Sequence, residues 1–466
     1  MTLDAEGAKA LRPGKKPMKK QIGNGPARLP LVLILVVAGV SALLAAPVPA
    51  FAAAPAAAAS GGDTAWVLTA TGLVLMMTLP GLALFYGGLV HARNVLSVLM
   101  HCFVISALVS VLWFAGAYSL AFTNGGSLNP WIGGLSTAFL QGVGIHSQHG
   151  AIPEAAFFMF QATFAIITPA LIIGAFVERI RFAAVLLFSA LWLILVYVPV
   201  CHWVWGGGWL AQLGVMDFAG GIVVHVTAGS AALVAALVIG KRRGFPNEIS
   251  IPHSPVMTAI GAGLLWVGWY GFNAGSALAA DGNAAMALLV THVSASAGAL
   301  TWMGIEWIEH RKASLIGTVT GAVAGLAAIT PASGFIGPAG ALPIGTAAGI
   351  ICYAATALVK RRWQIDDSLD VFAVHGLGGA LGSLLTGIFA APVLGGLGFP
   401  VAHSIAQQLT RQAIGVVAAG LWSAVLSYLI LKAVQAMVGL RVSRDEEAEG
   451  LDTIAHGERG YDLSVL

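Results

Sequence analysis

Long runs of apolar residues, separated by short polar segments, occupy most of the chain. A transmembrane helix needs about 20 mostly apolar residues, and runs of this kind recur throughout the sequence. We therefore predict an all-α membrane protein with eleven transmembrane helices. The predicted helices cover residues 66–90, 95–122, 155–177, 182–210, 218–240, 256–280, 284–305, 313–329, 338–359, 371–389 and 414–440.

The composition agrees with lipid as the solvent of this chain. Hydrophobic residues make up 58% of the 466 positions and charged residues 9%, whereas soluble domains carry about 25% charged residues. The 59 glycines suit closely packed membrane helices. The formal net charge of +3 gives no reason to expect a nucleic-acid partner.

Basic residues occur between alternate predicted helices. Cytoplasmic loops are rich in Lys and Arg, so this alternation predicts a mature N-terminus outside the cell and a cytoplasmic C-terminus. The alternate loops carry Arg93; Arg179 and Arg181; Lys241, Arg242 and Arg243; Arg311 and Lys312; Lys360, Arg361 and Arg362. The intervening loops carry only Arg411, near the start of the last predicted helix.

The N-terminus has the three parts of a secretory signal peptide. A basic region precedes an apolar stretch from Leu29 to Ala46, and Ala50-Phe51-Ala52 is an A-x-A cleavage site. We predict a cleaved signal peptide over residues 1–52, followed by a short periplasmic segment, 53–63. An uncleaved first helix is the alternative.

The three cysteines, Cys102, Cys201 and Cys352, lie inside apolar stretches and have no Cys or His at metal-ligand spacing. They are expected to be buried small side chains, and the sequence predicts no disulfide, metal site or cofactor.

Two histidines reveal a weak internal repeat within the membrane domain, residues 64–440. His225 in the fifth predicted helix and His375 in the tenth are each followed by small residues on the same helical face. Five helices separate them, and repeats of odd length insert with opposite topology. We predict inverted five-helix repeats over about 64–240 and 256–391, an extra eleventh helix over about 414–440, and a cytoplasmic tail over 441–466.

The same two histidines are the main candidates for chemistry. An ionisable side chain inside a membrane span indicates function, because lipid makes it costly. Two imidazoles that meet at the repeat axis would line a path for a small polar solute and could share a proton. The alternative is a pair of structural histidines in helix packing.

Asp217 precedes the fifth helix and lies on the same face as His225, eight residues later. Its carboxylate would stabilise a cation near the helix, or it would cap the helix N-terminus, where Asp is favoured. The residue alone leaves both interpretations open.

Aromatic side chains accompany the histidines. Phe160 and Phe164 are four residues apart in the third helix, and Trp269, Phe272 and Ser276 form a stripe in the sixth. Aromatic faces bind cations, so a Trp with a Ser hydroxyl would hold a small cation, and paired Phe rings would block water and ions. Taken singly, each ring is better explained by lipid packing or an interfacial belt.

Several long motifs, in order, resemble the family of ammonium transporters, methylammonium permeases and Rhesus glycoproteins, in its bacterial branch. The resemblance runs from about residue 63 to 461. The motifs are 80–88 (PGLALFYGG), 174–182 (GAFVERIRF), 217–225 (DFAGGIVVH), 268–276 (GWYGFNAGS) and 370–376 (DVFAVHG). The tail resembles that of the family at 439–442 (GLRV), 449–452 (EGLD) and 456–458 (HGE).

The resemblance implies a homotrimer in the bacterial inner membrane with one narrow pore per subunit. It implies substrate recruitment by Trp205, Ser276 and Phe164, with Asp217 stabilising that site. It further implies a gate of stacked Phe164 and Phe272, and pore histidines at His225 and His375. The tail is expected to take part in regulation by a nitrogen-regulatory PII-type protein at the cytoplasmic face.

The function expected from these features is ammonium transport, with methylammonium as an analogue. Ammonium would be recruited outside and lose its proton on entry, and ammonia would cross past the histidines. The alternatives are an ammonium sensor, which would usually carry a signalling domain after Leu440, and a general gas channel, which would need no cation-binding mouth. An enzyme is not expected, because the buried histidines lack a metal-ligand set or a nucleophile motif.

Overall fold

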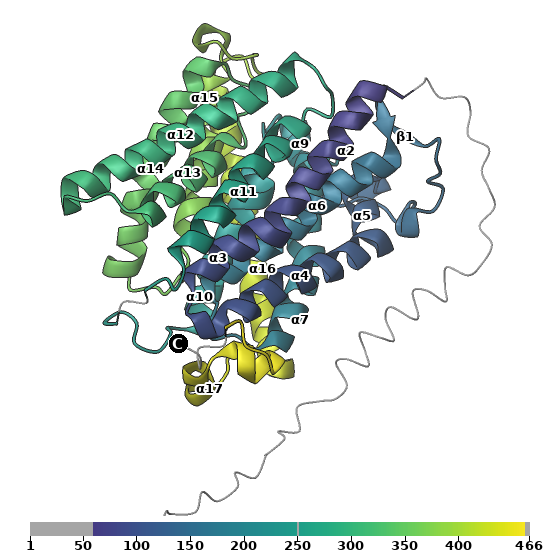
Figure 1. Ribbon diagram of the computed structural model, residues 1–466. Coiled ribbons are helices and arrows are strands. Elements are labelled where there is room, and N and C mark those ends of the chain that lie inside the picture. The colour runs from purple at the N-terminus through teal and green to yellow at the C-terminus, as the bar shows by residue number, and fades with distance from the viewer. Residues whose placement is uncertain (1–58, 249–250, 462–466) are drawn as a thin grey trace, which may run out of the picture.

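The structure is a computed structural model that describes residues 59–248 and 251–461 (Figure 1). The predicted signal peptide lies outside the described residues, so its cleavage remains a prediction.

Within the described residues, ten helical spans are long and apolar enough to cross a membrane. The first five are Gly61–Leu89 (α2 Gly61–Met76, η1 Met77–Leu82, α3 Ala83–Leu89), Ala92–Phe122 (η2 Ala92–Asn94, α4 Val95–Leu112, η3 Trp113–Ala117, α5 Tyr118–Phe122), Glu154–Ala175 (α6 Glu154–Ile172, η6 Ile173–Ala175), Phe182–Leu213 (α7 Phe182–Trp192, η7 Leu193–Tyr197, α8 Val198–Val204, α9 Trp209–Leu213) and Gly221–Ile239 (η8 Gly221–Val226, α10 Thr227–Ile239). The other five are Pro255–Gly275 (α11), Gly282–His310 (α12), Pro338–Arg362 (α14 Pro338–Ala357, η9 Leu358–Arg362), Phe372–Phe389 (η10 Phe372–Gly376, α15 Leu377–Phe389) and Ile405–Val438 (α16).

One predicted span is shorter than the others. The stretch predicted over 313–329 forms α13, Leu315–Ile329, which has 15 residues. The chain is thus an all-helical, multi-pass membrane protein, while the count of eleven spans remains a prediction. Apart from helices, the described residues contain a two-stranded antiparallel hairpin, β1 (Gln148–His149) and β2 (Ile152–Pro153), before α6.

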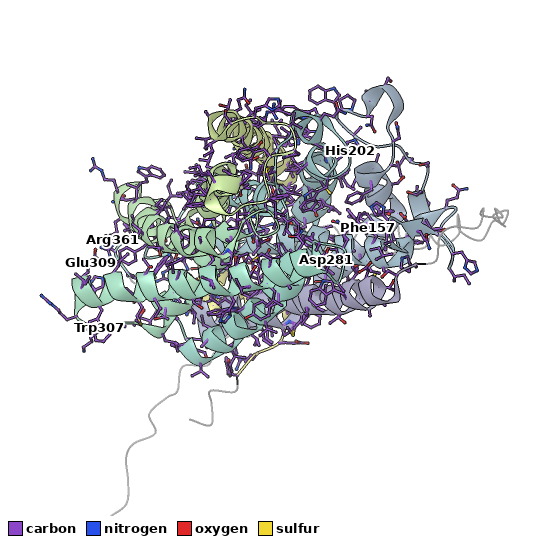
Figure 2. All side chains as sticks on the ribbon, turned by 90° about the horizontal axis from the view of Figure 1, so that it is seen from above. Phe157, His202, Asp281, Trp307, Glu309 and Arg361 are labelled. Atoms are coloured by element: carbon purple, nitrogen blue, oxygen red, sulfur yellow. The ribbon has the colours of Figure 1, made fainter. Side chains whose placement is uncertain are left out.

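The spans pack into one bundle whose outer surface is apolar. α11 packs along α2 and α3, α10 along α16, and α13 and α14 along α12. Figure 2, a view from above, shows Asp281 at one end of α12 and Trp307 and Glu309 near the other. Large apolar side chains such as Leu237 and Leu421 are exposed on the bundle, as expected of helices that face lipid.

The C-terminal segment closes one end of the bundle. It consists of residues 441–461 and contains α17 (Arg444–Glu449) and η12 (Asp452–His456), at the bottom of Figure 1. Ile180 pairs with Arg441 as an isolated bridge, and Asp452 accepts hydrogen bonds from the Leu96 and Ser97 amides at the start of α4, at 3.1 and 2.8 Å. We call this end the tail side and the other the opposite side.

The two spans that carry His225 and His375 begin alike. η8 and η10 are π-helical segments, each continued by an α-helix of 13 residues, α10 and α15. η8 begins on the opposite side, beside Trp205, whereas η10 begins on the tail side, beside Arg242. The two helices therefore run in opposite directions, as inverted repeats require.

Candidate functional site

Three aromatic rings from different helices contact one another in a row on the opposite side of the bundle. Trp205, at the end of α8, meets Phe164 of α6 edge to face, with ring centroids 5.8 Å apart. Phe164 in turn lies over Phe272 of α11, with centroids 4.3 Å apart and planes at 33°. Both Phe rings are fully buried. The structure therefore brings the predicted gate residues into direct contact.

Two histidines continue this column. His225 of η8 stacks on Phe272, with centroids 6.1 Å apart, and on Trp269, at 5.5 Å. His375 of η10 lies beyond it, and the two imidazoles are nearly parallel, at 20°. Their Nδ1 atoms are 3.3 Å apart, a distance at which one ring donates a hydrogen bond to the other.

Glycines allow this meeting of the two histidine helices. A Cβ atom on Gly229 would clash with the backbone of Gly376, and one on Gly379 would lie 2.7 Å from the Cβ atom of His225. Gly229 and Gly379, two of the small residues that follow the histidines, thus lie at the contact between η8–α10 and η10–α15. Backbone proximity of this kind is what small residues provide in membrane helices.

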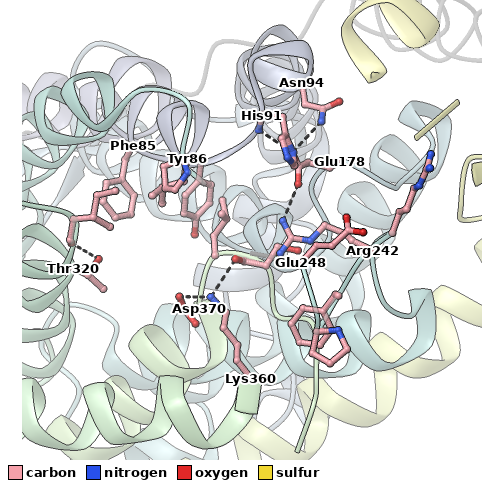
Figure 3. A pocket seen from close by; sticks show the side chains of 18 of the residues that line it. Phe85, Tyr86, His91, Asn94, Glu178, Arg242, Glu248, Thr320, Lys360 and Asp370 are labelled. Atoms are coloured by element: carbon pink, nitrogen blue, oxygen red, sulfur yellow. Dashed lines mark hydrogen bonds and ion pairs between the residues drawn. The ribbon is translucent and has the colours of Figure 1, made fainter. Parts of the chain in front are cut away.

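Two cavities adjoin the histidines, and one of them extends to the tail side. A small cavity of about 10 Å³ adjoins both imidazoles and is otherwise lined mainly by apolar side chains. Such a volume is at the lower limit for one water molecule. A much larger cavity, of about 1010 Å³, extends from His375 to the tail, and we call it the vestibule (Figure 3). Phe85, Val323 and His375 line both cavities.

Asp217 caps the helix of His225. Its Oδ1 atom accepts from the Gly220 and Gly221 amides at 2.9 and 2.6 Å, and its Oδ2 atom accepts from those of Ile222 and Val223 at 2.8 and 3.0 Å. Burial raises the pKa of this carboxyl, while the four N–H donors work in the other direction. The helix-cap interpretation therefore describes the geometry.

Asp217 also positions Trp205, whose indole N–H donates to the Asp217 carbonyl oxygen at 2.8 Å. Ser276 follows the end of α11, and its hydroxyl donates to the Phe272 carbonyl oxygen at 2.9 Å. That bond leaves the Ser276 oxygen able to accept a further hydrogen bond.

Two further buried histidines have contacts elsewhere in the bundle. His202, near the end of α8, has both ring nitrogens at carbonyl oxygens, those of Ala121 and Asn129, at 2.8 and 2.6 Å. His101 is buried and stacks on Phe182. All three cysteines are buried and free. No group of three or more His, Cys, Asp or Glu suited to a metal occurs among residues 59–248 and 251–461.

Sequence reasoning missed an ion-pair network on the wall of the vestibule. Arg242 binds Glu178 at 2.7 Å and Asp366 at 2.9 Å, and Glu178 also contacts the His91 ring at 2.6 Å, as Figure 3 shows. Arg179, fully buried, donates to the Ser368 hydroxyl and to the Asp366 carbonyl oxygen.

The network keeps its acids ionised. Burial alone would raise the pKa of Glu178, but the hydrogen bond from His91 and the charge of Arg242 lower that pKa well below its usual range. The pKa of Asp366 is likewise lowered, because the charges of Arg242 and Arg179 outweigh its burial. Glu178 and Arg179 fall within the motif at 174–182, but no motif joins them to His91, Arg242 and Asp366, which lie far apart from them along the chain.

A column of aromatic rings and imidazoles inside a helical membrane bundle defines a transport protein for a small solute. The profile of the Ammonium Transporter Family matches residues 65–461. The ammonium transporter of Bacillus subtilis is 45% identical over 407 residues, covering 87% of this chain and 99% of that protein. Ammonium transporter Amt1 of Archaeoglobus fulgidus is 45% identical over 402 residues, covering 86% and 100%.

Solved structures agree with this match. A structure described as a sensor Amt protein has a TM-score of 0.78 at 29% identity and covers 85% of this chain and 98% of its own. Mep2 of Saccharomyces cerevisiae has a TM-score of 0.76 at 36% identity and covers 83% and 89%. The chain belongs to the ammonium transporter family, and the prediction of ammonium transport is confirmed.

Proposed function

We propose that ammonium is bound on the opposite side, loses a proton there, and crosses as ammonia along the column from Trp205 to His375. The observation that carries this proposal is the uninterrupted order of contacts from Trp205 through Phe164, Phe272 and His225 to His375. The vestibule then opens next to His375.

Recruitment rests on the rings of Trp205 and Phe164 and on the hydroxyl of Ser276. A cation over an aromatic face gains up to about 2 kcal/mol when it is desolvated, and the Ser276 oxygen is free to accept one ammonium N–H. The buried carboxylate of Asp217 favours a positive charge in this region. The backbone carbonyl oxygen of the same residue accepts a hydrogen bond from the Trp205 indole and so holds the ring in place.

Entry into the column separates ammonia from the proton. Phe164 and Phe272 offer no polar group, and moving an unpaired charge into such a site costs many kcal/mol. Ammonia lacks that charge and passes to the imidazoles, which offer a donor and an acceptor. The proton follows a separate route, with the histidines as a relay.

We also propose the cellular setting. The basic loops around 93, 179–181 and 241–243 contact the tail, Lys360 and Arg361 line the same vestibule, and by the positive-inside rule this side would be cytoplasmic. The mature protein is then an inner-membrane homotrimer of eleven spans with a cleaved signal peptide. A PII-type protein would bind at the vestibule, where Glu447 and Ala448 of the tail form part of the rim.

An electrical measurement tests the pathway. Purified protein in liposomes on a solid-supported membrane receives an ammonium pulse, and we expect a transient current. The double variant His225→Ala/His375→Ala should abolish it, whereas His310→Ala, at the exposed end of α12, should retain it. Equal currents from the wild type and the double variant would contradict the proposed route.

A sensor is the second candidate function, because one similar structure is described as a sensor Amt protein. Deletion of the gene discriminates between the two. Loss of methylammonium uptake supports transport, whereas unchanged uptake with altered nitrogen-dependent gene expression supports sensing.

A further inference from the structure

The second histidine helix has an acidic residue at the same spacing as the first. Asp217 lies eight residues before His225, and Asp367 lies eight residues before His375. Asp367 is fully buried, and its Oδ2 atom accepts from the Phe372 amide at 2.7 Å, at the start of η10. Asp367 is therefore the tail-side equivalent of Asp217 in the inverted arrangement.

The two carboxylates differ in how well their charge is compensated. Both oxygens of Asp217 receive two backbone N–H donors each. The Oδ1 atom of Asp367 is buried and has no hydrogen-bond partner among the described residues. A buried, unpaired carboxylate oxygen is costly as an anion, and a proton removes this cost.

The neighbours of Asp367 point to the same conclusion. Asp370, three residues later, also has a buried Oδ1 atom without a partner among the described residues, while its Oδ2 atom binds Lys360 at 2.7 Å. Arg179 and Arg242 are engaged by Asp366, the residue before Asp367. Asp367 therefore faces a like charge at Asp370, and the one positive charge that acts on it, Lys360, is bound to Asp370.

Asp370, Lys360 and Tyr86 connect this position to the vestibule. All three line the vestibule together with His375, and Figure 3 shows the Lys360–Asp370 pair on its wall. Tyr86 lies within electrostatic range of both carboxylates, and its hydroxyl donates to the Leu171 carbonyl oxygen at 3.1 Å.

We propose that Asp367 and Asp370 form a proton-binding site at the tail-side end of the pore, which holds one exchangeable proton and returns it to ammonia in the vestibule. The proposal rests on the proposed function for its role and on the buried, unpaired oxygens for its existence. Two carboxylates in one site cannot both ionise freely, so one proton serves the pair.

The proton balance is simple. A proton arriving from the pore or from water binds a carboxylate oxygen and gives a neutral carboxylic acid. Ammonia that reaches the vestibule takes this proton, which leaves ammonium and the carboxylate. One O–H bond breaks and one N–H bond forms, and no electrons are exchanged.

Electrostatics support exchange near neutral pH. Burial and the charge of Asp370 raise the pKa of Asp367 to about 7. Between pH 6 and 8 the protonated fraction of such a group falls about tenfold, from about nine tenths to about one tenth.

Infrared difference spectroscopy of the purified protein, titrated from pH 6 to 8 without ammonium, tests the site directly. We expect a carboxylic-acid C=O band that disappears as the pH rises, is lost in Asp367→Asn, and is shifted in Asp367→Glu. Asp281→Asn is the matched control, because Asp281 also caps a helix, α12, through the Ala284 amide but lies on the opposite side. The control should retain the band.

The role is tested by ammonium-evoked current at tail-side pH 6, 7 and 8. We expect a pH dependence in the wild type and in Asp281→Asn, and none in Asp367→Asn. A band that persists unchanged in both Asp367 variants would overturn the proposal, as would an unaltered pH profile of current in Asp367→Asn. A titrating band without any wild-type ammonium current would support the proton site and contradict the proposed function instead.

Discussion

Asp217 combines two tasks in one side chain. Its carboxylate satisfies four N–H groups that the start of a helix leaves without partners. Its backbone carbonyl fixes the indole of Trp205. The same residue therefore caps a helix and positions the Trp205 ring. The sequence pattern alone could not distinguish a capping role from a role at the outer site.

The first prediction separates charge from capping at Asp217. Asp217→Asn keeps an oxygen acceptor but no charge, whereas Asp217→Ala removes every acceptor and leaves buried N–H groups unpaired, at about 1–3 kcal/mol each. We expect both variants to lose methylammonium uptake, and only Asp217→Ala to melt at a clearly lower temperature. Wild-type uptake in Asp217→Asn would show that the charge is unnecessary.

The second prediction concerns Trp205. Trp205→Leu keeps apolar bulk but removes the ring face that attracts the cation, at a loss of up to about 2 kcal/mol, so the apparent affinity should fall by about 10- to 30-fold. Radiolabelled methylammonium uptake over a concentration series measures this. Trp307→Leu, on the exposed surface of α12, should behave as wild type. An unchanged affinity in Trp205→Leu would favour a general gas channel.

At the scale of elements, glycine contacts allow the close approach of the two helices that carry His225 and His375. The third prediction is that Gly229→Val separates them, because a side chain there meets the backbone of Gly376. We expect loss of ammonium current and a lower melting temperature. Gly263→Val in α11, where a Cβ atom has nothing within 4 Å, is the matched control and should be tolerated. Normal current in Gly229→Val would contradict the close crossing.

Apolar patterning located the spans well and their ends less well. The last helix begins at Ile405. The sequence predicted a start at residue 414, because Gln408 and Gln412 interrupt the apolar run. Both are buried and donate to backbone oxygens of Gly214 and Met216. Hydropathy cannot anticipate such partners, since tertiary contacts make buried polar residues acceptable.

At the scale of the whole molecule, the tail side depends on charges from distant segments. The fourth prediction is that Arg242→Gln destabilises the protein by about 3–5 kcal/mol at pH 7, because it leaves the buried carboxylates of Glu178 and Asp366 unpaired. Thermal unfolding in detergent measures this. Arg362→Gln, an exposed change on the same side, is the control.

The pH dependence follows from the lowered pKa values of Glu178 and Asp366. Carboxyls with lowered pKa values stabilise the fold above their ordinary range, and this contribution is lost as the pH falls toward the folded values. The difference between wild type and Arg242→Gln should therefore be constant near pH 7 and shrink below about pH 4. A difference independent of pH would mean that Arg242 acts by packing alone.

The candidate site was largely predictable from the sequence, and its surroundings were not. His225 and His375 stand out because they are ionisable residues inside apolar spans, whereas the pairing of Phe164 with Phe272 was implied by the family resemblance. The vestibule network joins residues 178, 242 and 366, which only the folded chain brings together. Asp367 was within reach, since its spacing to His375 repeats that of Asp217 to His225.

The contact between the Nδ1 atoms of His225 and His375 has a consequence for direction. With one proton on each ring, the imidazole that donates through Nδ1 has a bare Nε2 atom, and its partner has an Nε2–H group. The two ends of the histidine pair therefore differ chemically, although the two helices that carry the histidines begin alike. Reversing this difference requires both rings to exchange tautomers together. The resemblance between the two histidine helices is therefore broken by the position of a single hydrogen atom.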